Sequence, residues 1–248
     1  LSTRPLMPPS ASLPFGTDRQ GRDLLAVMIV GTPQTLEIGV LAGLIGVLDL
    51  PTHSLGRQNK HLHMWREHCM GQSGIEEVTG LPCSLIDLFA SQMDNGIEER
   101  LLQWPGEPGE PVMCQIWEAT QHAGLIRIRD LCSDQGLPIK ADAQSKAATL
   151  QHVLALLQNL RLGLNAETFA STETFLFSLV AVGSQATMLT MENRTFIKEG
   201  IIALANHTTS SYPYYDAVVY ALETLWAGDG TKSLDHVTRE MDLELGLF

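Results

Sequence analysis

The chain has 248 residues, of which 44% are apolar and 18% charged, and its 16 basic and 28 acidic side chains give a net charge of −12. This length is enough for one large domain or two small ones, and the apolar share supports a hydrophobic core. The acidic excess disfavours unaided binding to nucleic acid, because attraction to phosphate needs Lys and Arg. It also provides no basic patch for an anionic membrane.

The charge is unevenly distributed. Residues 1–48 carry three basic and three acidic side chains, so the whole net charge belongs to residues 49–248. The chain has four cysteines, Cys69, Cys83, Cys114 and Cys132. No two of them form a C-x-x-C pair, which disfavours a zinc site, a redox motif or a disulfide framework. We therefore expect a change of domain near Leu48, a reducing compartment and no cofactor.

The first segment begins as an extended, proline-interrupted loop and then carries a motif. Residues 16–23 read GTDRQGRD and precede the apolar residues 24–30. This resembles the G-T-D-x-x-G-R-D stretch of inner-membrane permeases in oligopeptide, dipeptide and nickel ABC importers, where it comes before a transmembrane helix. The resemblance implies a permease-like fragment over residues 1–48 and, with it, an inner-membrane location as the alternative for the chain.

The apolar run of this fragment is short for a membrane span. Residues 36–48 would reach about 20 Å as a helix, against roughly 30 Å of hydrocarbon. Counting from Leu24 gives enough length but includes Pro33 and Glu37. A single working span is therefore disfavoured. We expect an apolar helix that packs or aggregates, and no transport by this chain alone.

From His61 onward the apolar spacing is helical. The predicted helices are Ser84–Gln92, Ile97–Trp104, Val112–Leu131, Ala147–Leu162, Thr172–Ala186, Glu192–Asn206, Asp216–Trp226 and Leu234–Leu243. Ser233 is placed to cap the last of them. No alternating run is long enough to predict a strand. The predicted fold is all-α, an array of antiparallel helices behind an extended, partly apolar N-terminal segment, with residues 49–74 as a linker.

Within this array, several motifs follow one another along the chain. They are GLP at 80–82 with LIDL at 85–88, IWEAT at 116–120, FLFSLVAVG at 175–183, TMENRTFI at 190–197, and ETLW at 223–226 with MDLELGLF at 241–248. In this order they resemble the fungal-specific transcription factor domain, which lies C-terminal to a binuclear zinc-cluster DNA-binding domain in fungal regulators. Ser178 stands where that family usually has proline.

The resemblance covers residues 75–248, and it implies a helical, nuclear, non-enzymatic regulatory domain. Such a domain would act through transcriptional co-regulators, an effector or self-association. The six closely spaced cysteines of the family's zinc cluster do not occur in the 248 residues, so direct nucleic-acid binding by this chain is not expected. Two alternatives stay open: a fragment of a permease, and an artificial junction near Leu48 that leaves the chain without a function as a whole.

The candidates for an effector or partner surface are aromatic: Trp117, Phe175, Phe177, Tyr214 and Trp226. Buried aromatic side chains more often belong to the core, which is the alternative for each. Tyr212, Tyr214 and Tyr215 surround Pro213 and predict a loop packed on the array.

Two further patterns are weighed for chemistry. His61, His63 and His68 beside Cys69 suggest a metal site, but His63 faces away from the other two on a helix, so a polar linker anchored by Trp65 is preferred. The GQSG at residues 71–74 is followed by Ile75 and lacks the preceding strand of a hydrolase nucleophile elbow. We therefore predict no catalytic residue and no metal ligand.

Overall fold

The computed structural model describes residues 6, 8–10, 14–20, 22–27, 46, 49–57, 63–77, 79–91, 96–137, 141–163, 174–207 and 212–247. The chain divides into two compact units, Leu1–Leu44 and Ile45–Phe248.

The first unit contains the GTDRQGRD motif, which forms a closed loop around Asp18. Thr17 and Asp23 make an antiparallel bridge, and the Asp18 carboxylate accepts the backbone N–H groups of Gln20 and Arg22 at 2.8 and 2.9 Å. The Arg22 side chain also pairs with it at 2.7 Å. These bonds, the Arg22 backbone bond first, lower the pKa of Asp18. The motif therefore specifies a local turn by itself.

The apolar run 36–48 lies almost entirely outside the described residues, so the prediction about its helix stays a prediction. Within the described ranges, no helix is both long enough and apolar enough to cross a membrane.

In the residues of the second unit that the structure describes, the fold is all-α apart from one short pair of strands. Its elements are η1 (Pro51–His53), β1 (Ser54–Leu55), α2 (Met64–His68), α3 (Cys83–Ala90), α4 (Ile97–Leu102), α5 (Pro111–Asp134), α6 (Ala143–Gly163), α8 (Thr174–Gly183), η2 (Ala186–Met188), α9 (Met191–His207), α10 (Tyr212–Ala227), α11 (Leu234–Glu240) and β2 (Leu245–Gly246). The all-α fold predicted from the apolar spacing is thereby confirmed.

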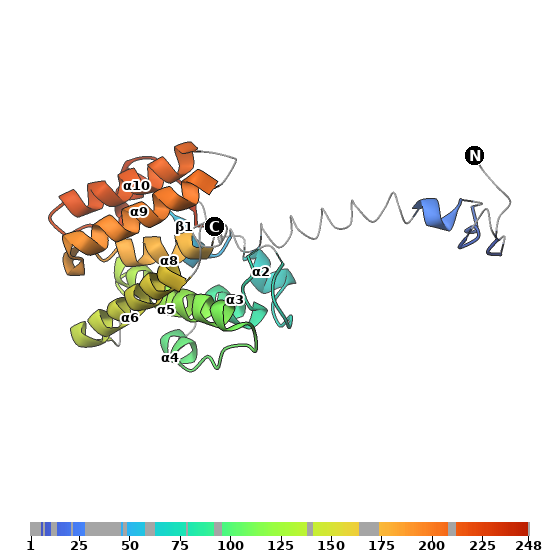
Figure 1. The fold of residues 1–248 in the computed structure, drawn as a ribbon, viewed down its shortest axis with the longest axis horizontal. Helices are drawn as coiled ribbons and strands as arrows, with labels where there is room; N and C mark the ends of the chain where they lie inside the picture. Colours follow the sequence, from blue (N-terminus) through green and yellow to red (C-terminus); the bar gives the residue numbers. More distant parts are fainter. Residues whose placement is uncertain are drawn as a thin grey trace. The chain divides into compact units, whose positions relative to one another are not determined.

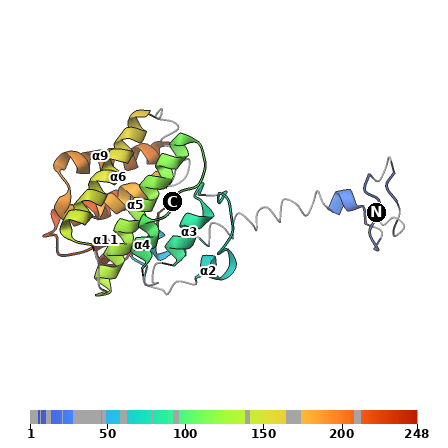
Figure 2. The same cartoon turned by 90° about the horizontal axis from the view of Figure 1, so that it is seen from below.

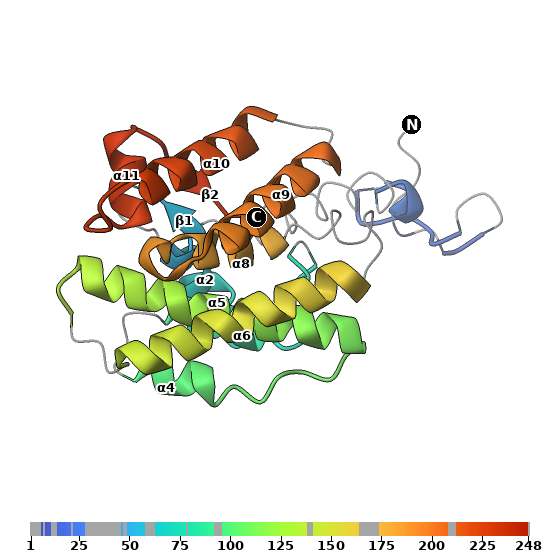
Figure 3. The same cartoon turned by 60° about the vertical axis from the view of Figure 1, so that its left-hand side comes forward.

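The helices pack in layers around α8 (Figure 1). On one side α8 contacts α9, which packs on α10, and on the other side it contacts α5 and α6. Figure 3 shows this order, with α9 and α10 above α8, and with α5, α6 and α4 below it. The long helices α5 and α6 lie against each other along much of their length (Figure 2). The interface between α5 and α6 is therefore a main packing interface of the second unit, and it is called the joint between α5 and α6 below.

The position of α8 follows from its composition. The helix is apolar on every side, and all its described residues from Phe175 to Gly183 are buried. A helix without a polar face must be covered all round, which places α8 at the centre of the main core. A second core surrounds α3, where Phe89 and Trp65 are buried. Trp65 donates its indole N–H to Asp87 at 2.7 Å, so the predicted anchoring role of this residue is confirmed.

Helix boundaries agree with local chemistry and correct several predicted bounds. Pro111 begins α5 one residue before the predicted start at Val112, because proline's fixed φ suits the first helical position. Gly136, at φ 68°, follows its end. Ser233 caps α11 and accepts the backbone N–H of His236 at 3.2 Å, as predicted. The predicted helix over 234–243 ends earlier, at Glu240.

Two predictions about irregular segments differ from the structure. The predicted linker 49–74 contains β1, which pairs antiparallel with β2 so that Leu55 lies opposite Leu245, and Leu55 is buried. The predicted tyrosine loop is wrong: Tyr212 begins α10 and Pro213 lies in its first turn. Proline is tolerated there because the first N–H groups of a helix have no partner within it.

Candidate functional site

The structure places two of the predicted surface residues in the core. Phe175 and Phe177 on α8 are each 1% exposed. The Phe177 ring stacks on His53 with centroids 4.1 Å apart and planes 7° from parallel. Burial of His53 lowers its pKa to about 3, helped by the charge of Arg127. Phe175 and Phe177 therefore stabilise the fold and do not form an exposed surface, as their alternative assignment to the core proposed.

Trp117 is buried too, but it lies beside a cavity. Its indole N–H donates to the Gly80 carbonyl at 2.8 Å, which joins α5 to the turn before α3. The cavity has a volume of about 370 Å³, and Trp104, Cys114 and Glu118 line it together with Trp117. Of the five predicted residues, Trp117 thus has the geometry of a residue that lines a pocket.

Trp226 joins three elements at the other end of the body. Its indole N–H donates to the Gly183 carbonyl at 2.9 Å, at the end of α8. The Arg194 guanidinium of α9 lies 5.7 Å from the ring centroid and donates to the Trp226 and Ala186 carbonyls at 3.3 and 2.9 Å. This arrangement is a cation–π and hydrogen-bond junction that fixes α9 against α10.

Tyr214 lies on α10, partly buried against the main core, and its ring meets Tyr215 edge-on at 5.3 Å. The five predicted residues thus come from α5, α8 and α10. Phe175, Phe177, Tyr214 and Trp226 belong to or pack against the main core, whereas Trp117 belongs to the second core.

The predicted histidine cluster is only partly described. His61 lies outside the described residues, His63 precedes α2 with a left-handed backbone at φ 58°, and His68 is exposed with Glu67 at 3.8 Å. A different group brings three metal-ligating side chains together: Glu118 and His122 on α5 with His152 on α6.

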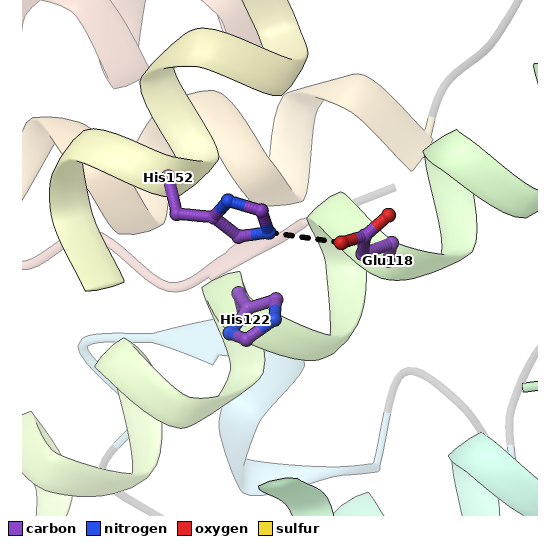
Figure 4. A group of neighbouring side chains, drawn as sticks. All are labelled: Glu118, His122 and His152. Carbon is purple, nitrogen blue, oxygen red and sulfur yellow. Dashed lines mark hydrogen bonds and ion pairs between the residues drawn. The ribbon is translucent and has the colours of Figure 1, made fainter. Parts of the chain in front are cut away.

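In this group, one potential ligand atom from each side chain lies within 4.8 Å of the others (Figure 4). His152 Nε2 and Glu118 Oε1 are 2.9 Å apart. The two imidazole rings meet edge-to-face, with centroids 4.7 Å apart and an interplanar angle of 81°. Glu118 and His122 are partly buried and His152 is exposed. The three side chains converge on the outer face of the joint between α5 and α6.

The electrostatics of this group favour a neutral imidazole. Burial lowers the pKa of His122, and the neighbouring His152 lowers it further, while Glu118 opposes them. Neutral imidazole is the form that binds a metal ion. Glu118 and His122 are four residues apart and therefore share a helix face, so this pair can be found from the sequence. The third side chain, His152, comes from another helix, and no local pattern connects it to the first two.

Three of the four cysteines have thiols with a raised pKa. Burial and nearby carboxylates raise the pKa of Cys69 and Cys83, and burial and Glu98 raise that of Cys132. A raised pKa keeps a thiol protonated and poorly nucleophilic at neutral pH. These three cysteines therefore have the properties of structural residues.

No family model matches the chain, and no curated protein and no solved structure matches it either. The order of its motifs and the contacts of its side chains are thus the grounds on which a function can be proposed.

Proposed function

We propose that residues 75–248 form a non-enzymatic regulatory domain of the fungal zinc-cluster regulator class. In this proposal the domain acts in the nucleus through a transcriptional co-regulator, an effector or a second copy of itself. Its acidic charge suits contact with protein partners rather than direct contact with nucleic acid.

One observation carries the proposal: motifs that resemble the family in sequence order also contact one another in space. Trp117 of IWEAT donates to Gly80 of the GLP motif at 2.8 Å. Trp226 of ETLW donates to Gly183, the last residue of FLFSLVAVG, at 2.9 Å. Arg194 of TMENRTFI lies over the Trp226 ring and donates to its carbonyl.

These contacts give the motifs a common physical role. Each indole N–H donates to a backbone carbonyl of another motif. At Gly183 a Cβ would lie 2.9 Å from a Leu222 methyl group. A chance likeness of short motifs would not require mutual contacts of this kind, so the contacts support the proposal.

An effector would find room beside Trp117. The cavity of about 370 Å³ combines the rings of Trp104 and Trp117 with the carboxylates of Glu107 and Glu118. Polar groups make up most of the accessible lining of this cavity, and the two carboxylates give it a negative charge. The two indole rings and the carboxylates fit a small ligand with a cationic or hydrogen-donating group.

A tethered reporter assay tests the proposed function. The full chain is fused to a heterologous DNA-binding domain, and transcription is compared with that of the DNA-binding domain alone. The proposal expects a several-fold change in reporter output together with recovery of a co-regulator or a second copy of the chain by crosslinking. A fusion that is expressed and helical by circular dichroism, yet leaves transcription unchanged and recovers neither partner, would contradict it.

A further inference from the structure

Glu118, His122 and His152 form a compact group of side chains whose donor atoms suit a transition metal. Imidazole nitrogen is a preferred ligand of zinc, copper and nickel, whereas magnesium and calcium favour sites made of oxygen alone. Two imidazoles and one carboxylate are a known zinc ligand set with a fourth position for water. The group lies on the joint between α5 and α6, the two longest described helices of the body.

We propose that Glu118, His122 and His152 bind one divalent transition-metal ion, zinc foremost, and that the ion fastens α6 to α5. The inference does not rest on the proposed regulatory function, because it concerns the stability of the helical body, although Glu118 and His122 also line the cavity beside Trp117.

The distances are close to those that zinc requires. A tetrahedral ion with ligands at about 2.0–2.2 Å holds its donor atoms about 3.3 Å apart. The donor atoms of the three side chains already lie within 4.8 Å of one another, and one pair is at 2.9 Å. Side-chain rotations that bring the donor atoms up to about 1.5 Å closer close the difference, and the backbones of the two packed helices can stay in place.

The surroundings are also suitable. Glu118 and His122 are neighbours because they are four residues apart on one face of a 24-residue helix. His152 is exposed, which gives the ion a path from solvent. Glu118 and His122 also line the cavity beside Trp117, so a fourth ligand has space on that side.

The body offers a matched comparison. His236 and Glu240 on α11 form a similar exposed pair, with His236 Nε2 and Glu240 Oε1 3.2 Å apart. The Lys232 amine donates to both oxygens of the Glu240 carboxylate, at 2.8 and 2.6 Å. This pair has a His–carboxylate contact with a cation in place of a second histidine, so it should not hold a metal ion.

The test is a metal titration of the full chain, with any affinity tag removed and residual metal stripped with EDTA. Co²⁺ is added first, because its visible absorption bands report tetrahedral coordination, and Zn²⁺ is then used to displace it. The inference expects one equivalent of Co²⁺ per chain and full displacement by Zn²⁺. A Zn²⁺ excess of 100 times Kd should raise Tm by about 5–10 °C.

Variants locate the site. Loss of a residue that only hydrogen-bonds to a metal ligand weakens metal binding about 10–100-fold. Loss of a ligand itself should weaken Zn²⁺ binding at least as much, which is the result expected for each of His122→Gln, His152→Gln and Glu118→Gln. His236→Gln should leave the affinity unchanged. Far-UV circular dichroism checks that each variant is folded.

The wild-type protein alone can overturn the inference, if it shows no tetrahedral Co²⁺ spectrum and no Zn²⁺-dependent rise in Tm. Binding that all three site variants retain, or that His236→Gln weakens equally, would also overturn it.

Discussion

Arg127 is a charged side chain buried inside the body, where it forms an ion pair with Asp235. Replacement of Asp235 therefore tests the packing around this charge sharply. Its side chain is fully buried, and Nη1 donates to Asp235 at 2.8 Å. Nε and Nη2 donate to the carbonyls of Thr52 and Ser54 at 3.3 and 3.1 Å. Burial opposes the charge of Arg127, but Asp235 first, then Asp130 and Asp134, outweigh it and raise its pKa. The ion pair thus joins α5 to α11 and to the segment around β1.

We expect Asp235→Asn to lower the free energy of unfolding by about 3 kcal/mol. Two unit charges 4 Å apart attract by about 4 kcal/mol at an effective dielectric constant of 20. Removal of one partner from a buried pair costs about 3–5 kcal/mol. The lower end applies here, because the two carbonyls still accept hydrogen bonds from Arg127 and the partly buried Asp130 side chain remains nearby.

The assay is urea unfolding followed by far-UV circular dichroism and tryptophan fluorescence, with linear extrapolation to water. Asp216→Asn, at an exposed position of α10, is the control and should change stability by less than about 0.5 kcal/mol. The double variant Arg127→Met with Asp235→Leu should recover most of the loss, because it removes both charges. A loss below about 1 kcal/mol in Asp235→Asn would refute the reasoning.

Two further changes probe the core. His53→Phe keeps a ring against Phe177 but cannot titrate. Since the pKa of His53 is about 3 in the folded state and about 6.5 when unfolded, only the unfolded wild type gains a proton between these values, so its stability falls as pH falls. Urea titrations at pH 7.5 and 5 should show a loss about 2 kcal/mol larger in the wild type than in the variant, and equal slopes would contradict the burial of a neutral imidazole. Gly124→Ala places a methyl group against the Phe89 ring and should lower the free energy of unfolding by about 1–3 kcal/mol. In the control Gly163→Ala, the added methyl group meets no atom within 4 Å, so this variant should not be destabilised. The same urea assay measures both variants, and a stabilised Gly124→Ala would argue against the contact with Phe89.

The helices were predictable from sequence where their pattern is local. The apolar composition of 174–183 predicts a buried helix, and α8 is the centre of the main core. The Ser233 cap was predictable for the same reason, because a cap depends on neighbours within one turn. Proline occurs both in loops and in the first turn of helices, so Pro213 alone does not distinguish the two. This explains the prediction of a loop where α10 begins.

Contacts between distant segments were not predictable from local patterns. Nothing near Leu55 indicates that it pairs with Leu245 at the other end of the chain. Arg127 stands between Ile126 and Ile128 on α5, and its partner Asp235 lies on α11. The same limit hid the candidate metal site, because His152 joins Glu118 and His122 only after α6 has packed on α5.

The proposed regulatory function is tested most directly by one continuous read of the transcript, from the codons ahead of Leu1 through the junction of Leu48 and Asp49. The proposal predicts that the helical body shares its reading frame with an upstream stretch that encodes six closely spaced cysteines, as in a binuclear zinc cluster. A frame that instead continues upstream of the GTDRQGRD motif into membrane-spanning segments would contradict it.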